Sequence, residues 1–191
     1  MRSGETLRET ALLVIDLQVG VVAACHDAEG VLARTAALVE RARAADVPVV
    51  YVQHEDDELP QGGPDWQLAP PLSPRPDEPR VFKRYRDAFV DTELQSLLEG
   101  WGVFRLLVAG AQSDFCVRTT AQRAAANGFD VVLVSDCHTT WDLDFAGVQM
   151  TAPQIIAHTN RFFTDLRYPD QTFRIATHDE VDLTWDEATE G

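Results

Sequence analysis

The sequence is poor in lysine and in positive charge as a whole. Lys83 is the only lysine among 16 basic side chains, and 31 acidic side chains bring the formal net charge to −15. So acidic a surface repels polyphosphate and anionic lipid headgroups, which predicts a protein with no nucleic-acid partner and no membrane partner. Cysteine is also scarce, because three cysteines, an odd number spread through 191 residues, do not make a disulfide framework.

Long hydrophobic runs are missing too. No apolar stretch approaches the ~20 residues that span a bilayer, and residues 1–10 mix charges without the apolar segment of a signal peptide. We therefore expect a cytoplasmic protein. With 45% hydrophobic residues, the composition suits one globular domain covering residues 1–191. We expect a core at about 10–178 and an acidic tail at 179–191, where Val181, Leu183 and Trp185 are the residues able to dock.

Short apolar runs alternate with amphipathic stretches along the chain. Strands are predicted at 11–15, 48–52, 104–109 and 131–134, with weaker candidates at 80–82 and 172–176, and helices at 31–42, at 116–127 and from 151 onward. Continuous apolar runs are typical of strands covered on both faces. The rhythm therefore predicts an α/β fold, with a parallel sheet between two layers of helices. A loop at 59–79 that holds seven of the ten prolines interrupts it, and a loop of that length is usually either functional or mobile.

Polar side chains that are able to take part in a reaction follow the predicted strands. Asp16 ends the first apolar run, Lys83 follows the weak strand at 80–82, and Cys116 lies beyond the third strong strand. Ligands in open α/β sheets bind beyond the carboxyl ends of the strands. We therefore expect these three side chains to meet at one edge of the sheet.

Each of the three has an ordinary structural alternative. Cys116 stands where a loop turns into a helix, where free N–H groups and a nearby lysine favour the thiolate, but buried cysteine is commonly just a small apolar residue. Asp16 could exchange a proton with the thiol or could cap a turn. Lys83 could be a surface charge, although a lone lysine among arginines indicates a need for a compact ammonium.

Four segments together resemble the isochorismatase-like cysteine hydrolases. They are the runs at 11–18, 81–85, 107–117 and 134–140, in the order and spacing of that family. The resemblance implies a three-layer α/β/α sandwich around a six-stranded, mostly parallel sheet. It also implies an Asp16, Lys83 and Cys116 catalytic triad.

The resemblance further implies a mechanism. Cys116 would attack a carbonyl carbon and form a thioester-type intermediate, Asp16 would move the protons, and Lys83 would stabilise the thiolate and hold the aspartate. A cis peptide between Ala111 and Gln112 would turn the Gln112 N–H toward the oxyanion, next to the N–H of Cys116.

Two departures of this sequence from the family's motifs narrow the range of reactions. Metal-binding members carry an Asp-x-His arrangement after the second strand, whereas residues 52–57 read VQHEDD, so we expect no metal and no cofactor. We expect His54 to line the pocket, and a cation bound by the His54 cluster is the alternative that stays open. Members that cleave vinyl ethers lack the cysteine, so Cys116 favours another reaction.

We therefore predict a metal-independent cysteine hydrolase that cleaves a C–N bond of a small amide, ureido compound or lactam. Two alternatives stay open: an isochorismatase-type vinyl-ether hydrolase, and a non-catalytic module that binds a small molecule. The family resemblance also leads us to expect a homo-oligomer, a dimer or a tetramer. The candidate pocket residues are Gln18, His54, Trp66, Tyr85, Gln112 and Phe115.

Overall fold

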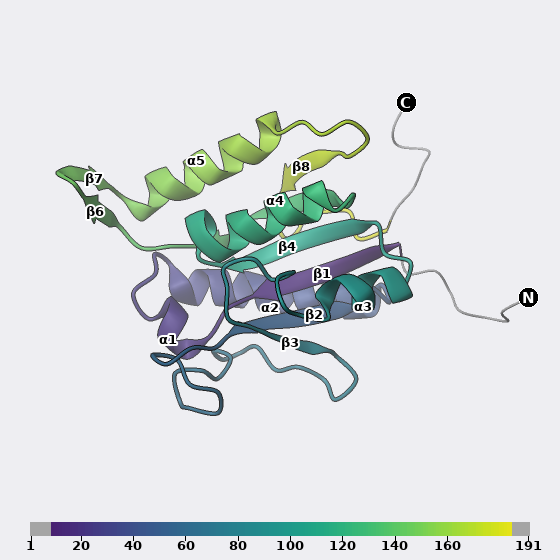
Figure 1. Cartoon of the computed structure of the whole chain (residues 1–191), viewed down its shortest axis with the longest axis horizontal. Coiled ribbons are helices and arrows are strands. Elements are labelled where there is room, and N and C mark those ends of the chain that lie inside the picture. Colours follow the sequence, from purple (N-terminus) through teal and green to yellow (C-terminus); the bar gives the residue numbers. More distant parts are fainter. Residues whose placement is uncertain (1–8, 185–191) are drawn as a thin grey trace, which may run out of the picture.

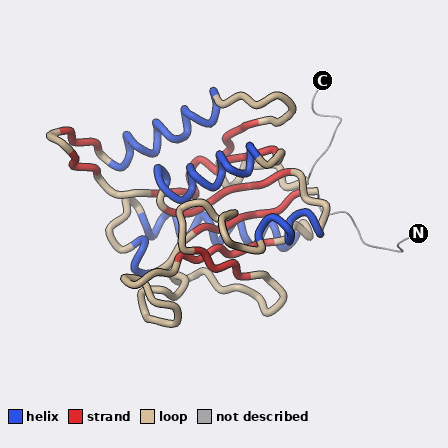
Figure 2. The backbone as a smooth tube through the Cα atoms, in the orientation of Figure 1, coloured by secondary structure: helices blue, strands red, loops and turns tan. Residues whose placement is uncertain are grey.

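The protein is built on one parallel sheet of six strands. The computed structural model describes residues 9–184, and its strand order is β3-β2-β1-β4-β5-β8, with every neighbouring pair parallel. The strands are β1 (Thr10–Ile15), β2 (Val49–His54), β3 (Arg80–Lys83), β4 (Arg105–Ala111), β5 (Asp130–Thr139) and β8 (Phe173–Ala176). Both weak strand candidates are therefore real strands, and each forms one edge of the sheet (Figure 2).

Helices cover both faces of the sheet and confirm the predicted three layers (Figure 1). Helix α2 packs on one face, and α3, α4 and α5 pack on the other. The helical segments are α1 (Val19–Val22), α2 (Ala28–Ala44), α3 (Leu94–Gly100), a π-helix (Ser113–Val117), α4 (Arg118–Ala126) and α5 (Ala152–Asp165). No helix among residues 9–184 is long and apolar enough to cross a membrane.

Local sequence explains why these elements begin where they do. All six residues of β1 are buried, as a strand covered on both faces requires. Helix α5 begins with a capping box in which Thr151 and Gln154 satisfy each other's free N–H groups, and Pro153 occupies the first turn.

Several elements differ from the sequence prediction, among them the short helix α1, which was not predicted. The helical run expected from Cys116 begins three residues earlier, as the π-helix that starts at Ser113. Helix α3 was not predicted, and neither was the antiparallel hairpin of β6 (Leu143–Phe145) and β7 (Val148–Met150), which projects beyond the sheet in Figure 1. The hairpin strands have three residues each, too few for a periodic signal.

The backbones of β1 and β4 approach closely where the two strands end. Gly110 pairs with Ile15 in the register, and a Cβ on Gly110 would lie 2.2 Å from the Ile15 carbonyl oxygen. Gly110 also has φ 146°, a conformation that glycine tolerates best. Asp16 follows Ile15 at φ 50°, a region that aspartate enters more readily than most residues.

Two segments outside the regular elements are anchored to the body. The proline-rich loop 59–79 hydrogen-bonds to the chain after β1, with Val19 N donating to Gln67 O and Gly20 N to Asp65 O, both at 2.9 Å. The segment predicted as an acidic tail is docked as far as residue 184, since Val181 and Leu183 are buried in the α2 side of the core. Trp185 lies outside the described residues.

Candidate active site

The structure brings Asp16, Lys83 and Cys116 together at the carboxyl edge of the sheet. Lys83 Nζ lies 2.6 Å from Asp16 Oδ2, and these two side chains are 0% and 1% exposed. Both also interact with the Cys116 thiol. The Asp16 carboxylate therefore contacts both the ammonium and the thiol.

Lys83 is held by the ends of two neighbouring strands. Besides Asp16, its ammonium donates to the backbone oxygen of Tyr85 at 3.1 Å and faces His54 Nδ1 at 3.5 Å. Burial acts to lower the pKa of Lys83, but the carboxylate of Asp16 and, after it, the interaction with Cys116 outweigh burial and raise this pKa. The lysine is therefore a permanent cation in the centre of the site.

Cys116 is protonated in the resting site. Burial, together with the charge of Asp16, raises the pKa of its thiol to about 12, and Lys83 offsets only part of this rise. The sequence predicted a stabilised thiolate from the helix start and the lysine. Burial of the thiol reverses that expectation, so the site needs a base, and Asp16 is the acidic side chain beside the thiol.

The backbone before Cys116 is arranged as the resemblance implies. The Ala111–Gln112 peptide is cis, and the Gln112 carbonyl accepts hydrogen bonds from the N–H groups of Phe115 and Val117, at 3.1 and 3.2 Å. Gln112 therefore forms the entry to the helical turn that carries Cys116.

A cavity of about 600 Å³ opens onto the cysteine. Three of the predicted pocket residues line it, namely His54, Gln112 and Phe115, together with Asp16 and Cys116 of the triad. The remaining lining residues are Gly20, Val21, Asp56, Glu58, Leu59, Asp65, Arg86, Ala111 and Trp141.

The other three predicted pocket residues lie outside this lining. Gln18 is fully buried, its amide donates to the backbone oxygens of His54 and Trp66 at 2.9 Å each, and it accepts from the His54 N–H at 2.8 Å. Trp66 is 5% exposed and packs against Phe82, whereas Tyr85 is 53% exposed at the surface. Gln18 therefore fixes the proline-rich loop against β2 and does not line the cavity.

Nine of the lining residues were not predicted as pocket residues. Two of them, Arg86 and Trp141, offer a cationic and an aromatic side chain to a substrate. Arg86 stacks over the Phe115 ring at 3.9 Å. Trp141 is exposed and lies two residues beyond the end of β5. An aromatic residue just beyond a strand end is the signal in the sequence that could have indicated a place in the cavity.

The cavity offers a cation a poor set of ligands. His54 Nε2 is 2.9 Å from Asp56 Oδ2, and because the Lys83 ammonium donates to Nδ1, Nε2 carries the proton and donates it to Asp56. Neither ring nitrogen is thus presented to a metal ion. One further group of three potential ligands lies elsewhere in the described residues: Asp136, His178 and Asp179. His178 Nδ1 there is bound to Asp136 at 2.6 Å, and we assign no metal to it.

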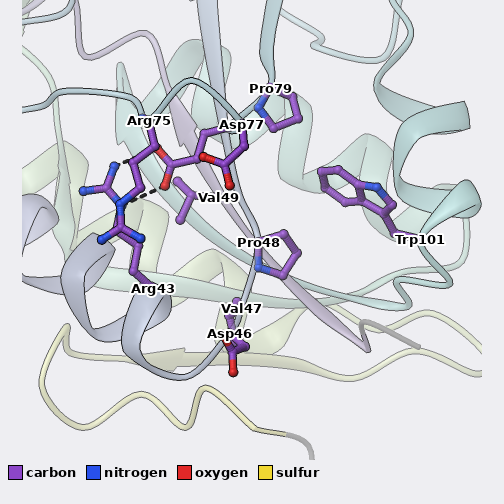
Figure 3. A pocket seen from close by; sticks show the side chains of 10 residues that line it. Arg43, Asp46, Val47, Pro48, Val49, Arg75, Asp77, Pro79 and Trp101 are labelled. Atoms are coloured by element: carbon purple, nitrogen blue, oxygen red, sulfur yellow. Dashed lines mark hydrogen bonds and ion pairs between the residues drawn. The ribbon is translucent and has the colours of Figure 1, made fainter. Parts of the chain in front are cut away.

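A smaller pocket of about 150 Å³ lies at the opposite edge of the sheet (Figure 3). Figure 3 shows Arg43 and Arg75 on one side of it and Trp101 on the other. Arg43 is paired with Glu78 at 2.6 Å. Because no cysteine, serine or histidine lines this pocket, the candidate site is the one at Cys116.

Solved structures share this arrangement of sheet and helices. An isochorismatase from Pseudomonas putida KT2440 has a TM-score of 0.83 at 28% identity, over 92% of this chain and 91% of that one. Another isochorismatase family protein has a TM-score of 0.79 at 30% identity, over 90% of this chain and 100% of that one. These comparisons define an α/β/α protein of the isochorismatase type.

The sequence comparisons lead to the same class. The family model described as the isochorismatase domain matches residues 10–161, so the chain belongs to the isochorismatase family. It is 41% identical over 151 residues to a streptothricin hydrolase from Streptomyces noursei, covering 75% of this chain and 60% of that protein. It is 30% identical over 160 residues to maleamate amidohydrolase from Pseudomonas putida, covering 68% and 72%. The chain spans only 51–60% of the length of the two streptothricin hydrolases it matches.

Proposed function

We propose that the chain is a cysteine hydrolase that cleaves a C–N bond of a small amide, ureido compound or lactam without a metal ion. The observation that carries the proposal is the buried pair of Asp16 and Lys83 next to Cys116, which is partly buried and lines one cavity. The printed activities of two relatives, a streptothricin hydrolase and a maleamate amidohydrolase, support C–N cleavage as the reaction.

The first half of the reaction forms a thioester. Cys116 Sγ bonds to the carbonyl carbon while Asp16 takes the thiol proton, and the carbonyl π electrons move to the oxygen. The backbone N–H groups of Gln112 and Cys116 stabilise this oxyanion. The C–N bond then breaks, the electron pair of the bond stays on nitrogen, and Asp16 returns the proton to the leaving amine.

The second half restores the enzyme. Asp16 takes a proton from water, whose oxygen attacks the thioester carbon and displaces the sulfur. The thiolate recovers the proton from Asp16, and the acid product leaves. Lys83 stays charged throughout, because its role is to keep the carboxylate of Asp16 in place and to offset negative charge on the sulfur.

A direct test is to trap the intermediate. Purified protein is mixed with a panel of small amides, ureido compounds and lactams, with isochorismate included to test the vinyl-ether alternative. Intact-mass and peptide mass spectrometry then locate any adduct. We expect an acyl adduct on Cys116; turnover of a substrate with no adduct and no dependence on Cys116 would contradict the proposal.

The charge of the cavity leads to a prediction about substrates. Asp56, Glu58 and Asp65 line it as exposed acids, whereas Arg86 is its only exposed cation among the described residues. We expect amides that carry an ammonium group to be hydrolysed in preference to matched amides that carry a carboxylate. Combining Glu58→Gln with Asp65→Asn should lower kcat/KM for the ammonium amide roughly three- to tenfold, since exposed charge pairs are worth ~0.2–1 kcal/mol each.

A matched control removes the same charge elsewhere. Asp46 follows α2, and Glu99 lies in the last turn of α3. Both side chains are exposed, and both lie near the amino ends of the strands, away from the cavity. The double variant Asp46→Asn with Glu99→Gln should leave the preference unchanged. Equal effects of the two double variants, or a wild-type preference for the carboxylate amide, would show that the cavity acids do not select the substrate.

A further inference from the structure

A buried chain of hydrogen bonds lies behind the nucleophile and takes no part in the mechanism above. Ser113 Oγ is 2.7 Å from His138 Nδ1, and His138 Nε2 is 2.9 Å from Asn160 Oδ1. The Asn160 amide nitrogen donates to the Ser135 backbone oxygen at 3.1 Å. Ser113 is 0% and His138 is 1% exposed, and neither lines the cavity at Cys116.

The direction of each hydrogen bond follows from the amide of Asn160. Because its nitrogen donates to Ser135, its oxygen faces His138 and accepts, so His138 Nε2 carries a proton. Burial lowers the pKa of His138 and keeps the ring neutral, although Asn160 and Asp136 act in the other direction. The bare Nδ1 of a neutral ring can then only accept, and the Ser113 hydroxyl donates to it.

The chain ends on the residue that follows Gln112. Ser113 is the first residue of the π-helix, and Asp114 beside it accepts a hydrogen bond from the Thr140 hydroxyl at 2.7 Å. Two consecutive residues of the turn are thus bound to the end of β5. A bulge in β5 makes this possible, because the pairing with β4 shifts from Val108–Leu133 to Gly110–His138.

We propose that His138 is a positioning residue, which acts through Ser113 to hold the Gln112 N–H in place for the oxyanion. The inference rests on the proposed function, in which Gln112 supplies one of the two donors. A backbone donor must lie about 2.7–3.1 Å from the oxyanion to stabilise it. A displacement of about 1 Å costs up to roughly 100-fold in rate, so a rigid anchor next to Gln112 affects kcat directly.

The anchor depends on the protonation state of His138. An imidazolium carries a proton on Nδ1, so it can no longer accept from Ser113. The hydrogen bond must then reverse, with Nδ1–H donating to the serine oxygen, and the hydroxyl proton must turn to another acceptor, which disturbs the anchor of the turn. The polar and titratable groups near His138 come from several elements. Asn160 lies on α5 and Asp136 on β5, and Asp114 of the π-helix binds Thr140, two residues after His138. On the α2 side, His26, Asp27 and Arg34 line a cavity of about 300 Å³ that His138 and Asn160 also line. We therefore expect kcat to fall at acidic pH when His138 becomes charged.

Asn160→Asp tests the proposal with almost no change in shape. A carboxylate opposite Nε2–H stabilises the imidazolium and raises the pKa of His138, by about one unit or more for a close opposite charge. The acidic limb of the kcat profile should therefore move about one pH unit upward, with KM unchanged. Asn127→Asp adds the same charge at the exposed end of α4 and should leave the profile in place.

The second readout needs no turnover. In 15N-labelled Asn160→Asp protein, the amide resonance of Gln112 should titrate together with the His138 ring. If the Gln112 amide shift does not change as the His138 ring titrates, the inference is overturned. This outcome can be read even if the protein shows no hydrolysis and the proposed function has failed. Conversely, coupled titration without any Cys116-dependent hydrolysis would overturn the proposed function alone.

Variants of Ser113 keep the inference testable if Asn160→Asp does not fold. Ser113→Ala removes the hydroxyl and should lower kcat roughly 10- to 100-fold with little change in KM. Ser113→Thr keeps the hydroxyl and should retain most of the wild-type kcat. Equal kcat values for the alanine and threonine variants would show that the hydrogen bond to His138 does not position the turn.

Discussion

Replacing Cys116 with alanine is expected to lower hydrolysis of every amide that the wild-type protein cleaves by at least about 10⁴-fold. The reason is chemical: without sulfur no thioester can form, and the remaining groups can only orient water against the substrate. Release of the amine or of ammonia measures the loss, and intact-mass spectrometry should show that the acyl adduct disappears with it.

Cys137→Ala is the matched control for this variant. Burial raises the pKa of the Cys137 thiol to about 12 as well, but Cys137 is fully buried in the core on the α2 side and lines no part of the cavity. Its loss should leave kcat unchanged. If Cys116→Ala were as active as Cys137→Ala, Cys116 would not be the nucleophile, and the binding-module alternative would gain support.

The second large effect is expected for Lys83→Arg, which should reduce kcat roughly 10²- to 10⁴-fold. Arginine keeps the charge, but its planar guanidinium cannot occupy the point from which the ammonium reaches Asp16 at 2.6 Å and Tyr85 O at 3.1 Å. Arg84→Lys, at the neighbouring position where the side chain is 76% exposed, should leave kcat unchanged.

The structure also changes what this variant should do to stability. The sequence alone predicts that the Lys83→Arg variant folds with little loss of stability. Lys83 is instead completely enclosed, so the larger side chain should cost about 1–3 kcal/mol of unfolding free energy through overpacking. Urea unfolding measures this cost; an arginine variant with wild-type kcat would show that a compact ammonium is not required.

The sheet and the proximity of Asp16, Lys83 and Cys116 could be predicted from simple patterns, whereas a catalytic role for the three residues came from the family resemblance and stays a prediction. Continuous apolar runs mark buried parallel strands, and the first polar residues after such runs lie at one edge of the sheet. Asp16 follows β1 and Lys83 ends β3. Their proximity could therefore be predicted without knowing where the side chains point. The cysteine lies in the helical turn directly after β4, which the same rule covers.

The pocket walls were harder to predict, because a position along the chain does not say where a side chain points. Gln18 stands two residues beyond Asp16, yet its amide satisfies buried backbone groups of β2 and the proline-rich loop. Tyr85 stands two residues beyond Lys83, yet its ring points to solvent, and only its carbonyl oxygen takes part in the site.

The bond between His138 and Ser113 has no signal in the sequence at all. His138 follows the predicted strand at 131–134, and only the bulge in β5 shifts the pairing so that it stands opposite Gly110. Its role also depends on Asn160, which lies on α5 and 22 residues further along the chain. Contacts of this kind arise from the packing of three elements and not from periodicity.

The close approach of Gly110 to Ile15 has a consequence for engineering the protein. No side chain separates the two backbones there, so the spacing between the acid that follows β1 and the turn that carries the thiol is set by main-chain atoms alone. Part of the cavity wall comes instead from residues 54–65 and from Trp141, next to the projecting hairpin. Libraries that vary those walls should therefore alter which amides are accepted while leaving the reactive centre intact.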